Sequence, residues 1–163
     1  MKQLISYIAP SAPATRRPAK GNESPVRVEI GFTPNWYRSK LEIDFSEKWH
    51  NDAKYRKETI IAMRDELDRR YPGRKVGVLL DNTLDLLTGI YGACTVAAIY
   101  GIPIIYSKNN WPNCAHKPLS DIEMTSLIPP DLDSNPFFQN LIKQVDWIEE
   151  DQGNILGFIN WQG

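Results

Sequence analysis

Asn154-Ile-Leu-Gly-Phe-Ile-Asn-Trp-Gln-Gly163 is the stretch that indicates the fold most directly, and it closes the chain. Residues 154–159 are mostly apolar and predict a buried strand, which runs into a polar, aromatic strand end at Asn160, Trp161 and Gln162. In parallel α/β sheets and barrels, the carboxyl ends of strands carry ligands and catalytic groups. No helix follows to cover this strand. We therefore expect either a fragment of a larger enzyme or half of an assembly.

Strands and helices alternate along the chain before this stretch. Strands are predicted at residues 26–30, 75–80 and 102–106, where apolar residues alternate or run continuously. Helices are predicted from Asn51 or Asp52 to Pro72-Gly73, over about residues 84–100, from the capping-box residue Ser120, and from Ser134 to before Gly153. Residues 107–119 read as a long loop. The order β-α-β-α-β-α-α-β predicts an α/β fold with parallel strands joined by right-handed crossovers.

Residues 1–25 carry four prolines with Arg16, Arg17 and Lys20 between them, a composition that favours an extended arm over a helix. The arm is either a disordered tail or a segment packed across the barrel or a partner subunit. The expected division of the chain is this arm followed by one α/β domain over residues 26–163.

The overall composition is that of an ordinary globular domain. Hydrophobic residues make up 42% of the chain and charged residues 24%. A net charge of -1 gives no electrostatic argument for nucleic acid or membrane as a partner. No apolar run approaches the roughly 20 residues needed to span a bilayer, and the first residues are too weakly apolar for a signal peptide. Cys94 and Cys114 do not make a disulfide framework, so a cytoplasmic location is expected.

Every predicted strand ends in a polar or aromatic cluster, and a parallel arrangement brings all the clusters to one face. We therefore predict a substrate site there. Its residues are Trp36, Tyr37 and Arg38 after the first strand, Asp81 and Asn82 after the second, Tyr106, Asn109, Asn110 and Trp111 after the third, and Asn160, Trp161 and Gln162 after the fourth.

Two of these residues carry catalytic hypotheses. Arg38 suits a bidentate grip on a substrate carboxylate, or it pairs with Glu42 or Asp44 on the surface. Asp81 suits a general acid or base, or it caps the following helix. Cys114-Ala-His116 offers two zinc ligands without an identifiable third, so no metal site is assigned.

Several segments together resemble the uroporphyrinogen decarboxylase superfamily, and most of all its branch of anaerobe proteins near the corrinoid methyltransferases. They are Glu29-Ile-Gly-Phe-Thr-Pro-Asn-Trp-Tyr-Arg38, Ile43-Asp-Phe-Ser-Glu-Lys-Trp-His50, Tyr91-Gly-Ala93, Asn110-Trp-Pro112 and Gly157-Phe-Ile-Asn-Trp-Gln-Gly163. The resemblance runs from about Pro10 to the last residue. Because the family consists of longer (β/α)8 barrels of the TIM type, it implies that this chain is the amino-terminal half of such a barrel.

The resemblance also implies a substrate pocket at the carboxyl ends of the strands. Pro34-Asn-Trp36 with Arg38 is similar to a stretch that binds tetrapyrrole carboxylates, but a second arginine of that stretch is absent. Asp81 matches an aspartate that contacts the pyrrole nitrogens, although the Phe-Ser-Asp pattern around it is missing. These departures weigh against uroporphyrinogen itself as the substrate.

The expected function is therefore that of a uroporphyrinogen decarboxylase-like protein in corrinoid-linked methyl transfer. The complete enzyme would use corrinoid and zinc, with its His-x-Cys motif in the carboxyl-terminal half, and no cofactor is assigned to this chain itself. The alternatives are decarboxylation of a tetrapyrrole-type acid and a non-catalytic half-barrel that binds a corrinoid or a subunit. Expected partners are a small-molecule substrate, a corrinoid protein, and a second copy or the other half, which would cover the strand edges at residues 26–30 and 155–159.

Overall fold

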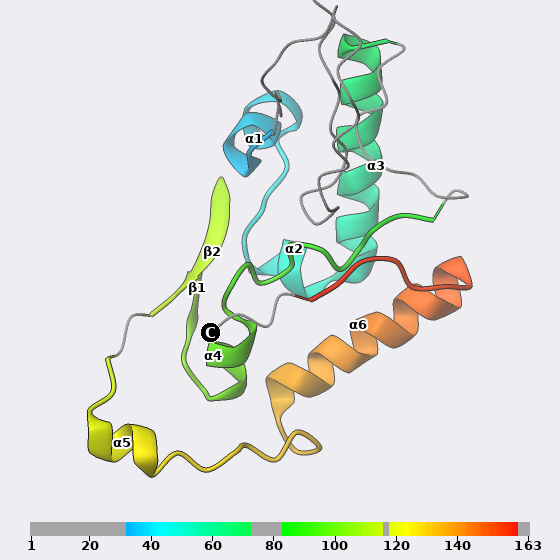
Figure 1. The fold of residues 1–163 in the computed structure, drawn as a ribbon. Helices are drawn as coiled ribbons and strands as arrows, with labels where there is room; N and C mark the ends of the chain where they lie inside the picture. Colours follow the sequence, from blue (N-terminus) through cyan, green and yellow to red (C-terminus); the bar gives the residue numbers. More distant parts are fainter. Residues whose placement is uncertain (1–31, 73–82, 116–117, 160–163) are drawn as a thin grey trace, which may run out of the picture.

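The computed structural model describes residues 32–72, 83–115 and 118–159 (Figure 1). Within these ranges the elements are α1 (Pro34–Leu41), α2 (Glu47–Asn51), α3 (Ala53–Arg70), α4 (Thr95–Ile99), β1 (Ile104–Ser107), β2 (Asn110–Cys114), α5 (Asp121–Thr125) and α6 (Pro136–Gln152). The two strands form an antiparallel hairpin, in which Ile104 pairs with Cys114 and Ser107 with Asn110.

The main helices begin and end where local chemistry satisfies their free backbone groups. The Asp52 side chain accepts a hydrogen bond from the Tyr55 amide at the start of α3, and the Asn135 side chain accepts one from the Phe138 amide at the start of α6. Helix α6 ends at Gly153, whose φ of 75° is left-handed and favours glycine. The predicted capping box at Ser120 is confirmed, since Ser120 and Glu123 bond reciprocally at the start of α5.

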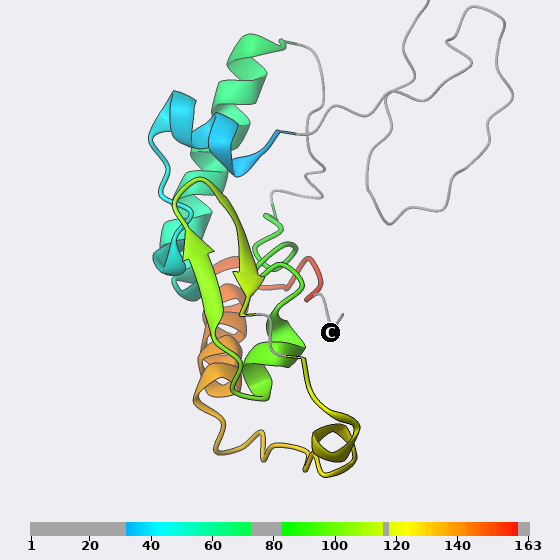
Figure 2. The same ribbon diagram turned by 90° about the vertical axis from the view of Figure 1, so that its left-hand side faces the viewer.

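A single hydrophobic core joins α2, α3, α6 and the segment before α4. Its fully enclosed members include Phe45, Leu86, Ile90, Leu141 and Ile148. The hairpin lies on the side of α2 away from α6, and α4 lies near the base of the hairpin (Figure 1, Figure 2). The Phe45 amide donates to the Lys108 carbonyl at the hairpin turn, which fixes the hairpin against this core.

Residues 118–135 leave this body and return to it. They include α5, which stands apart from the other helices in both ribbon views (Figure 1, Figure 2). Several large apolar side chains of this excursion are exposed, among them Ile122 at 80% and Ile128 at 82%. The excursion is therefore not part of the core described above.

The helix predicted over residues 84–100 is wrong except for its last turns, which form α4. Tyr91 and Gly92 have φ values of 57° and 56°, and Gly89 has 87°, none of which an α-helix can accommodate. The Asp85 carboxylate accepts hydrogen bonds from the Leu87 and Thr88 amides and so favours a turn in place of a first helical turn. Gly89 and Gly92 therefore form turns that pack closely against Trp111 and Pro112, where the sequence predicted a helix.

The strand predicted over residues 154–159 is also wrong, because the backbone there joins no sheet. Gly157 has a φ of 115°, and the Phe158 amide donates to the Thr88 hydroxyl instead of to a strand partner. The predicted strand at 102–106 is found as β1, but its partner is β2, which forms within the predicted loop at 107–119. The helix ending near Pro72 and the helix before Gly153 are confirmed as α3 and α6.

The remaining fold predictions fall on other parts of the chain. The extended arm at residues 1–25 and the strands at 26–30 and 75–80 lie outside the described residues. The one strand pair within the described ranges is antiparallel, as hairpins are, and it does not test a parallel barrel. The half-barrel stays a prediction.

Candidate functional site

The structure describes about half of the predicted site residues. Helix α1 carries Trp36, Tyr37 and Arg38, and the hairpin carries Tyr106, Asn109, Asn110 and Trp111. Asp81, Asn82, Asn160, Trp161 and Gln162 lie outside the described residues. The two described groups approach each other, since an Asn109 side-chain amide donates to the Asn35 side chain of α1 at 3.4 Å.

Aromatic rings connect α1 to the hairpin through the core. The Trp36 and Tyr37 ring centroids are 5.1 Å apart, and Tyr37 lies 6.5 Å from Phe45. Phe45 in turn lies 6.2 Å from Trp111 of the hairpin. We call Trp36, Tyr37 and Trp111, which the buried Phe45 connects, the aromatic face. All three were predicted as site residues, and Trp111 is 45% exposed.

Arg38 is partly exposed on helix α1. No ion pair joins it to Glu42 or Asp44, although all three residues are described. Desolvation raises the pKa of Asp44, but hydrogen bonds from Ser46 and the charges of Lys108 and Arg38 outweigh it and lower the pKa overall. The surface pairing considered for Arg38 is therefore limited to a longer-range attraction to Asp44.

His50 lies behind the aromatic face and is fully buried. Its Nδ1 accepts a hydrogen bond of 3.1 Å from the Tyr91 amide, so its Nε2 carries the proton in the neutral ring. Among the described residues Nε2 has no hydrogen-bond partner. Burial and the charge of Arg56 lower the pKa of His50 to about 4. His50 is thus a neutral, structural imidazole that holds the turn at Tyr91.

Arg56 is the most unusual residue that sequence reasoning missed. It is completely buried, and its guanidinium donates to the carbonyls of Leu86, Trp49 and His50 and to the Gln144 side chain, at 2.7 to 3.2 Å. Desolvation lowers its pKa to about 10, which leaves it charged at neutral pH. The signal in the sequence is its spacing. Arg56 stands four residues before Ile60, and Ile60, Met63 and Leu67 recur at helical spacing along α3.

Tyr91 and Gln144 extend this network to the surface. The Tyr91 hydroxyl donates to the Asn51 side chain at 2.7 Å and accepts from the Gln144 amide at 2.9 Å. Gln144 also donates to Asn140 at 2.7 Å. The buried Arg56 charge is therefore connected, through Gln144, to side chains that reach solvent.

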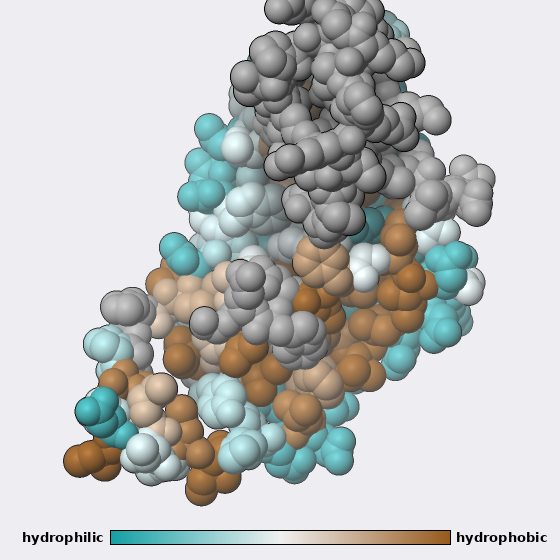
Figure 3. All heavy atoms as spheres, viewed as in Figure 1, coloured by the Kyte–Doolittle hydropathy of each residue, from teal (hydrophilic) through white to brown (hydrophobic). Residues whose placement is uncertain are grey.

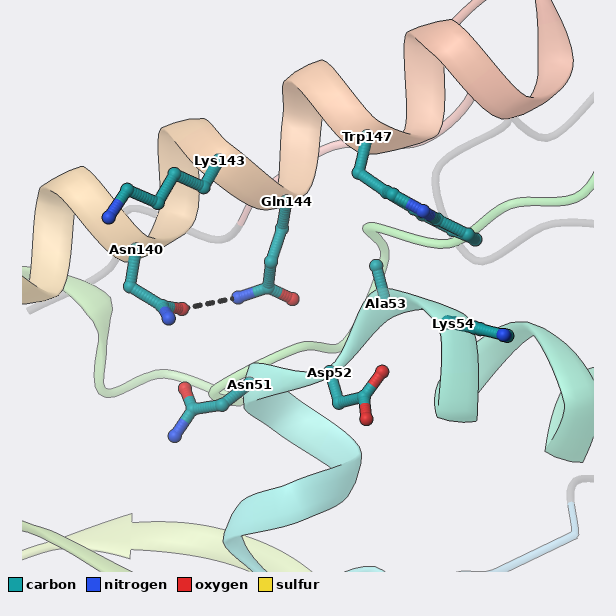
Figure 4. Close-up of a pocket in the computed structure, with 8 residues that line it drawn as sticks. All are labelled: Asn51, Asp52, Ala53, Lys54, Asn140, Lys143, Gln144 and Trp147. Atoms are coloured by element: carbon teal, nitrogen blue, oxygen red, sulfur yellow. Dashed lines mark hydrogen bonds between the residues drawn. The ribbon is translucent and has the colours of Figure 1, made fainter.

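A groove opens where these amides reach the surface. Figure 4 shows Asn140, Gln144 and Trp147 projecting from α6 toward the junction of α2 and α3. The groove has a volume of about 420 Å³, and its lining residues are Asn51, Asp52, Ala53, Lys54, Asn140, Lys143, Gln144 and Trp147. We call it the amide groove. Its two lysines suit a carboxylate or another anion, although the Asp52 carboxylate lies beside them and both hydrogens of the Gln144 amide are already donated within the protein.

No group of three metal-ligating side chains occurs within the described ranges. His116 is outside them, so the structure does not test its predicted pairing with Cys114, and Cys114 instead lies against Cys94. The zinc that the family resemblance implies has no described ligand set here. None of the described helices is long and apolar enough to cross a membrane.

Comparisons of the chain with family models, with curated proteins and with solved structures find no match. The case for a function therefore rests on the residues themselves and on how the described ones are arranged.

Proposed function

We propose that the chain serves a uroporphyrinogen decarboxylase-like protein in cytoplasmic, corrinoid-linked methyl transfer, where it binds a flat macrocyclic ligand on the aromatic face. One observation carries the proposal. Four of the five segments that resemble the family, ending at Arg38, at His50, at Ala93 and at Pro112, meet around one connected set of rings. Segments that were quoted for sequence alone thus pack together in one part of the fold, which supports the proposal.

The aromatic face has the chemistry that a conjugated macrocycle requires. Trp111 is 45% exposed while its ring packs 5.8 Å from the buried Trp49, so it is both accessible and held in place. A rigid aromatic side chain provides a large contact area at a small loss of conformational entropy. Arg38 and Asn110 lie on the same two elements and supply donors for polar groups at the edge of a ring system.

The role assigned to these residues is binding and orientation. His50, the histidine within the described ranges, is enclosed and neutral, so it does not serve as an axial ligand to a corrinoid. The zinc of the complete enzyme would activate a thiol acceptor, and its ligands are not among the described residues. Arg56 and Tyr91 keep the backbone around the face in place without contacting the ligand.

Decarboxylation of a tetrapyrrole-type acid is the second candidate function, and the amide groove favours it. Lys54 and Lys143 line the groove beside three side-chain amides. A tetrapyrrole with acidic side chains would place carboxylates against such donors, whereas a corrinoid with amidated side chains gains little from lysines. The two candidates therefore predict different sites of contact.

A non-catalytic binding or assembly role is the third candidate, with a second copy of the chain as the partner. Figure 3 shows apolar surface over α5 and along the carboxyl-terminal segment. Its exposed side chains include Ile122, Met124, Leu127, Ile128, Ile155 and Phe158. Exposed apolar patches of this kind are typical of interfaces.

Equilibrium titration of tryptophan fluorescence separates the first two functions. Hydroxocobalamin and uroporphyrin are each added to the wild-type chain and to variants. The corrinoid function predicts that Trp111→Ala weakens cobalamin binding at least about tenfold, as for loss of one stacking side chain. Tyr100→Ala is the matched control, because Tyr100 is exposed to a similar degree (42%) and belongs to the end of α4, neither to α1 nor to the hairpin.

The acid-decarboxylase function predicts instead that uroporphyrin binds, that Lys143→Ala weakens it, and that added salt weakens it further. Absence of cobalamin binding at 100 μM protein, or equal binding by Trp111→Ala and wild type, would contradict the corrinoid proposal. Sedimentation under the same conditions measures the assembly role, which a concentration-independent monomer would contradict.

A further inference from the structure

The chain contains two cysteines, and the fold brings them together although 20 positions separate them in the sequence. Cys94 lies at the amino-terminal end of α4, and Cys114 ends β2. Both are free thiols; Cys94 is buried and Cys114 is partly exposed. Burial raises the pKa of the Cys94 thiol, and the nearby Cys114 thiol raises it further.

Backbone packing places the two segments side by side independently of the thiols. A Cβ atom on Gly92 would lie 3.4 Å from the Pro112 carbonyl oxygen and 3.6 Å from its ring. Gly92 precedes Cys94 by two residues and Pro112 precedes Cys114 by two, so this close approach lies two residues from each cysteine. Farther along, the Ala115 amide donates to the Pro103 carbonyl, which holds the end of β2 in place.

We infer that Cys94 and Cys114 form a reversible disulfide site, whose reactants are low-molecular-weight disulfides such as oxidised glutathione. A disulfide requires Cβ atoms close together and side chains that point toward each other, and the close approach of Gly92 to Pro112 brings the two cysteines into the same small region of the fold. The bond would link the start of α4 to the end of the hairpin. The inference does not depend on the proposed function, although the linked hairpin also carries Trp111 of the aromatic face.

The exposure of each thiol determines the order of the steps. The Cys114 thiolate, which solvent reaches, attacks oxidised glutathione; a mixed disulfide forms and one glutathione thiolate leaves. The Cys94 thiolate then attacks the Cys114 sulfur of that mixed disulfide and releases the second glutathione. The protein dithiol loses two electrons and two protons, and one glutathione disulfide is reduced to two thiols.

The second step should be the slow one. Burial, followed by the neighbouring Cys114 thiol, raises the pKa of Cys94 to about 12. Only a small fraction of Cys94 is then thiolate at neutral pH, so the glutathione adduct on Cys114 should accumulate before the internal disulfide forms. In a reducing compartment such a bond is transient and responds to the redox state.

The experiment incubates the full chain with glutathione buffers of increasing oxidised fraction, quenches it with acid and maps its peptides by mass spectrometry. We expect a transient glutathione adduct on Cys114, then a Cys94–Cys114 cross-link with the loss of two hydrogens, reversed by dithiothreitol. Hydrogen exchange of the amides in β1 and β2 should slow at least severalfold in the oxidised protein. The cross-link mapped in the wild type does not depend on any variant folding.

Two variants define the roles. Cys94→Ala replaces a small buried side chain with another and should stop at a stable adduct on Cys114, whereas Cys114→Ser should form neither adduct nor cross-link. Disulfides between chains in place of the internal one would overturn the inference. The inference would also be overturned if, in the most oxidised glutathione buffer, both thiols of the wild-type protein stay free or the Cys114 adduct persists unchanged.

Discussion

Replacing Arg56 with methionine should destabilise the protein strongly, because the guanidinium satisfies four buried acceptors. The carbonyls of Leu86, Trp49 and His50 and the Gln144 side chain would all lose their donor in Arg56→Met. A buried acceptor left without a partner costs about 1 to 3 kcal/mol. The lower value is appropriate here, because methionine also removes a buried charge that has no carboxylate within hydrogen-bond distance among the described residues.

The expected loss in the free energy of unfolding is therefore about 4 kcal/mol, a large part of the about 5 to 15 kcal/mol of a typical domain. For a chain of this length the corresponding fall in the melting temperature is about 12 °C. Arg56→Lys keeps the charge but has a single nitrogen that cannot reach all four acceptors, so it should lose about half as much.

Urea denaturation followed by circular dichroism measures these differences. Arg64→Met is the matched control on the same helix, because among the described residues the Arg64 guanidinium pairs with its neighbour Asp65 alone, at the surface. That variant should stay within about 0.5 kcal/mol of wild type. An Arg56→Met protein as stable as the Arg64→Met control would refute the reasoning, since it would mean that the four acceptors do not depend on Arg56.

Three further predictions follow from single residues. The pKa of His50 falls from 6.5 in the unfolded chain to about 4 in the folded one, so the free energy of unfolding should decrease by up to roughly 3 kcal/mol as pH falls from about 6.5 to about 4. His50→Gln should flatten this pH dependence in urea melts. An unchanged slope would exclude His50 as its source. Gly157→Ala places a Cβ against the Asp85 carboxylate at a φ of 115°, whereas at Gly101, with a φ of 81°, an added Cβ would meet no other atom. Thermal melts should show Gly157→Ala to be less stable than Gly101→Ala by about 1 to 3 kcal/mol. Equal losses of stability would argue against the contact with Asp85. Tyr91→Phe removes the hydroxyl between Asn51 and Gln144 and should lower the free energy of unfolding by about 1 to 2 kcal/mol, while a stabilised variant would contradict the network.

Local sequence signals predicted the two long helices well. Asp52 caps the start of α3 with its side chain, and Gly153 ends α6 in a left-handed conformation that favours glycine. These two helix ends could therefore be predicted from the sequence. The turn around Tyr91 could not. A density of small residues fits a helix as well as a series of left-handed turns, and the choice depends on packing against Trp111 and Pro112 far along the chain.

The candidate site shows the same division. Trp36, Tyr37 and Trp111 were predicted as side chains that follow strands; the structure places the first two in helix α1 and connects them to Trp111 through Phe45. Arg56 could not, because an arginine in a helix is normally a surface residue. Its spacing from Ile60 places it on the apolar side of α3, but the carbonyls that gather around it in three dimensions are what identify it as a buried cation.

Hydrogen exchange with and without hydroxocobalamin tests the central claim most directly, because it locates the ligand on the chain. The account predicts that saturating cobalamin slows exchange in α1 and β2, which carry Trp36 and Trp111, and leaves α5 unchanged. It also predicts that the Trp111→Ala protein shows no such protection at the same cobalamin concentration. Protection confined to the α6 side of the amide groove, or to none of the described elements, would contradict the claim that the aromatic face is the binding site.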